Sequence, residues 1–132
     1  MAANVGIVLV PHSASLAEGT AELAGQVGGE TVTIATAGGT DDGRIGTSLA
    51  KISRAVQLAD AGAGVLILPD LGSSVLTVRA LLADPDDLPR QVVMADAPFV
   101  EGAVAAAVTA AGGGDLKAVL DAAQEARHAR KL

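Results

Sequence analysis

The chain has 132 residues, half of them hydrophobic, with a single aromatic side chain, a net charge of −6 and no cysteine. This length fits one compact domain covering residues 1–132. The acidic charge and the lack of aromatic stacking surfaces argue against nucleic-acid binding, and the absence of cysteine excludes disulfides and thiolate chemistry. The N-terminal apolar run is too short for a signal or membrane segment, so we expect a cytoplasmic protein without membrane insertion.

Four apolar segments rich in β-branched residues are predicted to be strands: residues 5–10, 31–35, 65–68 and 91–94. The first and third are apolar throughout, which is typical of parallel strands covered on both faces. Acidic residues around Pro85, among them Asp86 and Asp87, are attributed to a solvated turn.

Helical patterns alternate with these strands. Leu16, Leu23 and Val27 recur at helical spacing, and we expect them to share one buried side with Ala17, Ala21 and Ala24. Further helices are predicted over residues 49–59 and 74–82, after Pro98, and from a cap at Asp115. The resulting order, β-α-β-α-β-α-β-α-α, predicts an α/β fold with an open, mainly parallel sheet and helices on both faces.

Polar residues directly follow each predicted strand, at 11–13, 38–43, 69–74 and 96–98. Open α/β sheets bind ligands beyond the carboxyl ends of their strands, near the point where strand order reverses. All four clusters are therefore expected on one edge of the sheet.

His12 and Asp70 are the candidate catalytic residues at this edge. A neutral imidazole can act as a nucleophile when a carboxylate holds its other nitrogen, and Asp70 could supply that carboxylate. Taken alone, His12 could be a polar strand terminus and Asp70 a turn residue. Their joint position at adjacent strand ends favours the catalytic interpretation.

The loops beside the pair offer hydroxyls and backbone N–H groups that could hold a phosphoryl group. The expected lining residues are Ser13, also a candidate helix cap, and Gly38, Gly39, Thr40, Gly72 and Ser73. Neither loop matches a nucleotide-binding fingerprint, since Thr47 stands where a P-loop needs lysine. Asp41 and Asp42 alone indicate a magnesium site only weakly, so we expect no cofactor and no metal on this chain.

Four motifs distributed over the chain resemble those of one known family: Ile-Val-Leu-Val-Pro-His-Ser at 7–13, Gly-Gly-Thr-Asp-Asp-Gly-Arg-Ile-Gly-Thr-Ser at 38–48, Asp-Leu-Gly-Ser at 70–73 and Ala-Pro-Phe-Val-Glu-Gly-Ala at 97–103. They are similar to the DhaM-type phosphotransfer subunits of phosphoenolpyruvate-dependent dihydroxyacetone kinases, relatives of mannose-type enzyme IIA of the sugar phosphotransferase system (PTS). Pro11 and Pro69 depart from the residues expected before the key His and Asp.

The resemblance implies that His12 takes a phosphoryl group from HPr and passes it to ADP bound on the nucleotide-holding kinase subunit. Asp70 would be the partner of His12, with Gly39, Thr40 and Ser73 lining the site. The resemblance also implies a homodimer. Some relatives carry HPr-like and enzyme-I-like domains downstream; because this chain ends at Leu132, we expect its donor to be a separate protein.

Two other functions remain open at this point. The chain could be a mannose-type enzyme IIA that passes its phosphoryl group to a sugar-specific IIB protein. It could also be a non-catalytic regulatory α/β domain in which His12 is structural. The long glycine-rich motif at 38–48 favours the kinase subunit.

Overall fold

The computed structural model describes residues 3–84 and 88–132, so the turn expected around Asp86 and Asp87 lies outside the described residues. The strands are β1 (Gly6–Val10), β2 (Ile34–Thr36), β3 (Val65–Pro69) and β4 (Val92–Met94). The helices are α1 (Ala14–Gly28), α2 (Leu49–Ala59), α3 (Ser73–Ala83), α4 (Phe99–Ala111) and α5 (Leu116–Glu125), followed by the 3₁₀ turn η2 (Ala126–His128).

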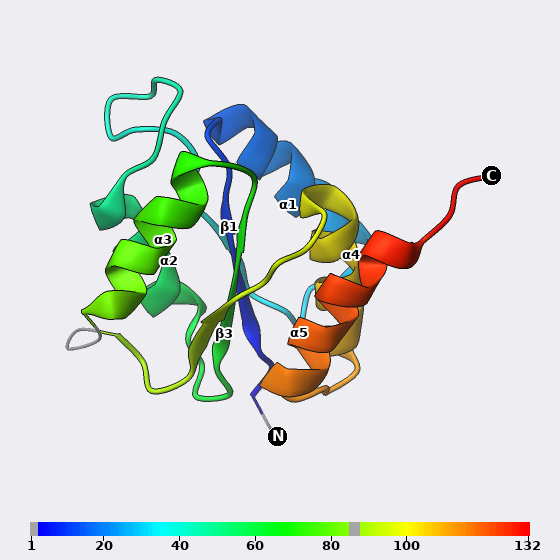
Figure 1. The fold of residues 1–132 in the computed structure, drawn as a ribbon. Helices are drawn as coiled ribbons and strands as arrows, with labels where there is room; N and C mark the ends of the chain where they lie inside the picture. The colour runs from blue at the N-terminus through cyan, green and yellow to red at the C-terminus, as the bar shows by residue number, and fades with distance from the viewer. Residues whose placement is uncertain (1–2, 85–87) are drawn as a thin grey trace.

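The strands form one parallel sheet in the order β2-β1-β3-β4. Helices α2 and α3 cover one face, while α1, α4 and α5 cover the other (Figure 1). Every residue of β1 and β3 is buried, as their continuous apolar runs predict. The predicted α/β architecture is therefore confirmed. Among the described residues, no helix is both long enough and apolar enough to cross a membrane.

Helix α1 buries its alanines and leaves its larger apolar side chains partly exposed. Leu16, Leu23 and Val27 are 42%, 46% and 54% exposed, whereas Ala17 and Ala24 are fully buried. The reason is the neighbour: α1 packs against α4, whose buried residues are also small, so the two backbones approach closely and large side chains do not fit between them. The expected burial of Leu16, Leu23 and Val27 is therefore wrong, whereas that of Ala17 and Ala24 is confirmed.

Strand β2 covers Ile34–Thr36 rather than the predicted residues 31–35. Its register is set by pairing with β1, where Ile7, Val8 and Leu9 lie beside Ile34, Ala35 and Thr36. Residues 31–32 lie in the turn that leads from α1 into the sheet. Local β-propensity located the strand, but pairing with β1 decided its ends.

The strand order reverses between β1 and β3, which are neighbours in the sheet although β2 and α2 separate them in the chain. Their register pairs Val10 with Pro69, so the segments that leave the two strands begin side by side. His12 lies in one of these segments and Asp70 in the other. The sheet thus brings together residues 58 positions apart at its topological switch point.

Candidate active site

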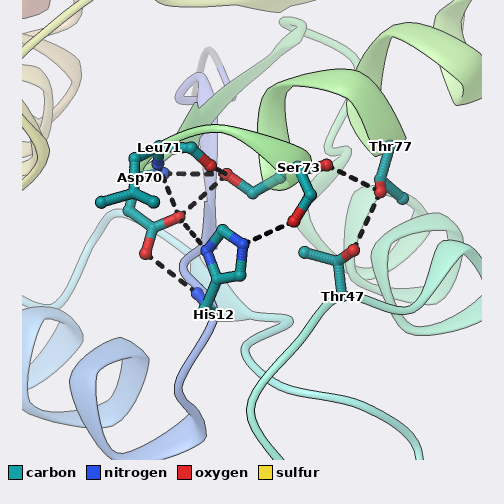
Figure 2. Close-up of polar contacts among 7 residues, drawn as sticks. His12, Thr47, Asp70, Leu71, Ser73 and Thr77 are labelled. Carbon is teal, nitrogen blue, oxygen red and sulfur yellow. Dashed lines mark hydrogen bonds and ion pairs between the residues drawn. The ribbon is translucent and has the colours of Figure 1, made fainter.

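His12 and Asp70 make two contacts at the carboxyl ends of β1 and β3 (Figure 2). The backbone N–H of His12 donates to Asp70 Oδ2 at 3.0 Å, and His12 Nδ1 lies 2.8 Å from Asp70 Oδ1. The histidine side chain is 20% exposed and the aspartate side chain 12%. One carboxylate therefore holds both the backbone and the ring of His12, in a site that still opens to solvent.

The Asp70 carboxylate is surrounded by donors. Its Oδ1 accepts the Leu71 backbone N–H at 2.7 Å and the Ser74 hydroxyl at 2.9 Å. Burial acts to raise the pKa of Asp70, but these hydrogen bonds and those from His12 outweigh it and leave the pKa below its ordinary value. Asp70 is therefore a carboxylate at neutral pH.

This charge state determines where the hydrogen of a neutral His12 ring lies. A carboxylate can only accept hydrogen bonds, so the hydrogen must be on Nδ1, pointing at Asp70. Nε2 then carries the ring's free lone pair. It faces Ser73 Oγ at 2.6 Å, and the serine hydroxyl is the donor in that contact. The geometry thus makes Nε2 the nucleophilic atom.

Helix α3 begins beside Nε2 without a side-chain cap. Its N-cap is Gly72, which offers no side-chain hydrogen bond, whereas Ser13 caps α1 and Ser48 caps α2 through their hydroxyls. Uncapped N–H groups at a helix start, together with the helix dipole, favour an anion. The Ser73 hydroxyl lies at the same place, so the start of α3 can receive phosphoryl oxygens next to the nucleophile.

The glycine-rich loop packs closely against the His12 segment. Gly39 donates to the Pro11 carbonyl at 3.3 Å, and Gly46 donates to the His12 carbonyl at 2.9 Å. A Cβ on Gly38 would lie 2.5 Å from the Ser13 carbonyl oxygen, and Gly39 has a φ of +77°, a conformation that favours glycine. Both glycines are therefore required by the shape of this wall of the site.

The polar side chains of this loop bond mainly to one another. The Thr40 hydroxyl donates to Asp42 and accepts from the Arg44 backbone N–H, while Ser48 donates to Asp41 at 2.7 Å. Hydrogen bonds from Thr40 and Arg44 hold the pKa of Asp42 below its ordinary value. Within the part of the chain that the structure describes, no three His, Asp or Glu side chains gather in a way that could hold a metal ion.

The sequence-predicted residues take different places around the pair. Ser73 contacts His12 directly, and Gly38, Gly39 and Gly72 form the adjacent backbone. The hydroxyls of Ser13 and Thr40 are engaged, Ser13 as the cap that accepts the Leu16 N–H and Thr40 within its loop. The cluster after β4 lies at the same sheet edge, where Asp96 and Ala97 line a cavity together with Asp70, although Asp96 itself pairs with Arg127, 3.4 Å away. His128 is exposed in η2.

Several supporting residues escape prediction from sequence. Ser74 donates to the Asp70 carboxylate and accepts the Asp70 N–H, and Lys51 Nζ donates to the Gly38 carbonyl at 2.8 Å. Thr47 and Thr77 bridge the glycine-rich loop to α3 at 2.8 Å. The four-residue spacing from Asp70 to Ser74 across a helix start is the one local signal that could have indicated such a contact.

Comparison with known proteins identifies the family of the chain. The family EIIA-man, described as the PTS system fructose IIA component, matches residues 6–120. The chain is 36% identical to the phosphoryl donor subunit DhaM of a PEP-dependent dihydroxyacetone kinase from Providencia stuartii, over 96% of this chain and 28% of that protein. It is 38% identical to a DhaM subunit from Listeria innocua, over 79% of this chain and 84% of that protein.

A solved structure shows the same fold. The crystal structure of EF1359, a protein of unknown function, superposes with a TM-score of 0.82 at 37% identity and covers 92% of this chain and 94% of its own. The chain spans 28% of the length of the first curated relatives that it matches, which are longer proteins. The family match extends over residues 6–120, and the match to the Listeria relative covers most of both chains. The chain therefore belongs to the EIIA-man family of mannose-type PTS enzyme IIA proteins, and over most of its length it is similar to DhaM subunits.

Proposed function

We propose that this chain is the phosphocarrier of a PTS-dependent dihydroxyacetone kinase. In this proposal His12 Nε2 accepts a phosphoryl group from phospho-HPr and passes it to ADP on the nucleotide-binding kinase subunit. The observation that carries the proposal is the His12–Asp70 contact of 2.8 Å, because it leaves Nε2 as the free nucleophilic nitrogen. The similarity to DhaM relatives, which are named as phosphoryl donor subunits, supports the choice of this pathway.

In the first transfer, the nitrogen–phosphorus bond of the donor phosphohistidine breaks as the bond from phosphorus to His12 Nε2 forms. The donor imidazole leaves with the electron pair of the broken bond. The His12 ring keeps its Nδ1 hydrogen and gains positive character, which the ionised Asp70 carboxylate stabilises. The Ser73 hydroxyl and the uncapped start of α3 are placed to receive the phosphoryl oxygens.

In the second transfer, the Nε2–phosphorus bond breaks as an oxygen of the ADP β-phosphate bonds to phosphorus, which yields ATP on the partner subunit. His12 returns to the neutral Nδ1–H form that it had before the cycle. Transfers of this kind depend mainly on positioning and charge stabilisation. The proposal therefore assigns no nucleotide, metal or other cofactor to this chain, and the phosphohistidine is its only covalent intermediate.

A second candidate function is favoured by the description of the matched family as a PTS fructose IIA component. A sugar-system IIA protein would accept the phosphoryl group at the same nitrogen and pass it to a IIB protein. The two functions differ only in the acceptor, so they are separated by offering each acceptor to the phosphorylated chain.

The test begins with phosphoenolpyruvate, enzyme I and HPr, followed by intact-mass analysis. We expect an acid-labile gain of one phosphoryl group on the wild type, none on His12→Gln, and the wild-type result on the matched control His128→Gln. No gain on the wild type would reject both carrier functions and favour a regulatory domain. The phosphorylated chain is then mixed with ADP and the nucleotide-binding subunit, or with a IIB protein; transfer only to IIB would reject the kinase function.

The proposal includes the cytoplasmic location and the homodimer expected above. The family resemblance supports the dimer, and light scattering of the purified chain across a concentration series tests it. A monomer mass at all concentrations would remove the dimer from the proposal and leave the transfer chemistry unaffected.

A further inference from the structure

A closed circuit of hydrogen bonds runs through His12, the glycine-rich loop and helix α3. Figure 2 shows the part of it that leads from His12 through Ser73 and Thr77 to Thr47. The Gly46 backbone N–H donates to the His12 carbonyl at 2.9 Å. The next residue, Thr47, contacts the Thr77 hydroxyl at 2.8 Å, and Thr77 donates to the Ser73 carbonyl at 2.9 Å. Ser73 closes the circuit through its 2.6 Å contact with His12 Nε2.

The direction of each hydrogen bond follows from the donors available. The single hydrogen of the Thr77 hydroxyl is directed to the Ser73 carbonyl, so Thr77 Oγ1 must accept from Thr47. The hydrogen of Ser73 points to Nε2, because Nδ1 carries the ring's only hydrogen. Each hydroxyl therefore has one defined role, and replacing any of them with a methyl group breaks the circuit at a known bond.

The bond from Thr77 to the Ser73 carbonyl lies inside the first turn of α3. A threonine hydroxyl that bonds to the carbonyl four residues earlier shifts the local geometry of a helix. Here that carbonyl belongs to the residue whose side chain faces the nucleophile. Thr47, in the glycine-rich loop, contacts Thr77 from the side opposite the helix, and the Gly46 N–H bonds the same loop to the backbone of His12. The position of Ser73 relative to Nε2 is thus set from two sides.

We propose that Thr47 and Thr77 are positioning residues that hold Ser73 and the start of α3 at His12 Nε2. The inference deepens the proposed phosphocarrier function and rests on it. When phosphorus bonds to Nε2, that lone pair is used, and Ser73 donates to a phosphoryl oxygen instead. The Thr47–Thr77 bridge is untouched by this exchange, so it keeps the oxygen-binding donors in the same place before and after transfer.

The first test needs no phosphoryl donor. Long-range ¹H–¹⁵N spectra of the histidine rings report the hydrogen bond at His12 Nε2 in the resting protein, and the exposed His128 is an internal reference. We expect Thr47→Val and Thr77→Val to shift the His12 Nε2 resonance, while Thr47→Ser and Thr77→Ser, which keep the hydroxyl, restore it. The matched control is Thr109→Val, near the C-terminal end of α4 and at the opposite edge of the sheet.

The second test measures single-turnover phosphorylation by phospho-HPr at increasing donor concentration. We expect the maximal rate to fall about tenfold in each valine variant, with the half-saturating donor concentration unchanged, because one positioning hydrogen bond is lost while the docking surface is intact. The serine variants and Thr109→Val should keep the wild-type rate.

The outcomes separate this inference from the function on which it rests. A wild type that accepts no phosphoryl group rejects the proposed function, whereas an unshifted Nε2 resonance in both valine variants rejects the positioning role whatever the activity. Unchanged maximal rates in both valine variants, with an active wild type, also reject the positioning role. Melting curves check that each variant is folded. If Thr47→Val is unfolded, the resonance and the rate of Thr77→Val alone test the positioning role, because Thr77 is partly exposed.

Discussion

The carboxylate of Asp70 binds His12 twice, accepting the backbone N–H through Oδ2 at 3.0 Å and facing Nδ1 through Oδ1 at 2.8 Å. The first contact fixes the path of the backbone after β1, and the second fixes the orientation of the His12 ring. Because both come from one side chain, a change at Asp70 should affect the structure of the site and its chemistry together.

Asp70→Asn should slow phosphorylation of His12 by about 100-fold, since a neutral amide stabilises the developing charge on the ring poorly and can turn its NH₂ toward Nδ1. The free energy of unfolding should fall by about 2 kcal/mol, because hydrogen bonds to a charged acceptor are replaced by weaker ones. Rapid-quench phosphorylation and urea unfolding measure the two effects. Wild-type rates in a folded Asp70→Asn variant would contradict the role given to this carboxylate.

The stability that Asp70 provides should disappear at acid pH. Its pKa in the folded protein lies below the ordinary value of an aspartate, so as pH falls the unfolded chain takes up the proton first and unfolding is favoured. Well above pH ~4, the difference in unfolding free energy between wild type and Asp70→Asn should have its full size. It should be lost as the pH falls through the pKa of Asp70 in the folded protein. Urea unfolding in steps of pH measures it.

The control for this titration is Asp121→Asn, which removes an exposed carboxylate paired with Lys117 at 2.8 Å. An exposed pair of this kind contributes little, so the control should change stability only slightly at every pH. A wild-type advantage over Asp70→Asn that persists undiminished in strong acid would show that the Asp70 charge does not contribute to stability.

Ser73→Ala should reduce the maximal rate of phosphorylation about tenfold while leaving the fold intact. The variant loses the hydroxyl that lies 2.6 Å from Nε2 and that is placed to donate to a phosphoryl oxygen. Ser53→Ala, in α2, makes the same chemical change away from the site and should keep the wild-type rate. Equal rates for the two variants would assign Ser73 no part in the transfer.

Gly38→Ala should destabilise the protein by about 2 kcal/mol or more, since its Cβ would lie 2.5 Å from the Ser13 carbonyl oxygen and the backbone there must move. The matched control is Gly19→Ala, within α1, where an added Cβ meets nothing within 4 Å. That change should raise stability by about 0.5–1 kcal/mol, because alanine favours the helix. Thermal melts compare the two, and a Gly38→Ala protein as stable as Gly19→Ala would contradict the close packing of this loop.

The sequence by itself determined the alternation of elements and the edge of the sheet that carries the site. Continuous apolar runs at β1 and β3 require burial on both faces, and a buried parallel pair places the residues that follow it at a common edge. That reasoning brought His12 and Asp70 to neighbouring strand ends and identified Ser13 and Asp115 as the caps that the structure shows.

Only the tertiary structure decided the parts that depend on close approach between distant elements. It left Leu16, Leu23 and Val27 of α1 exposed, because α4 presents a face of small residues that only the alanines of α1 can approach. It also shifted β2 to the register that β1 imposes. It also brought Ser73, Thr77 and Thr47 into one circuit around Nε2, through contacts between residues about 30 or more positions apart. Hydrogen bonds of this kind depend on where backbones meet in space, and the local pattern of residues does not carry that information.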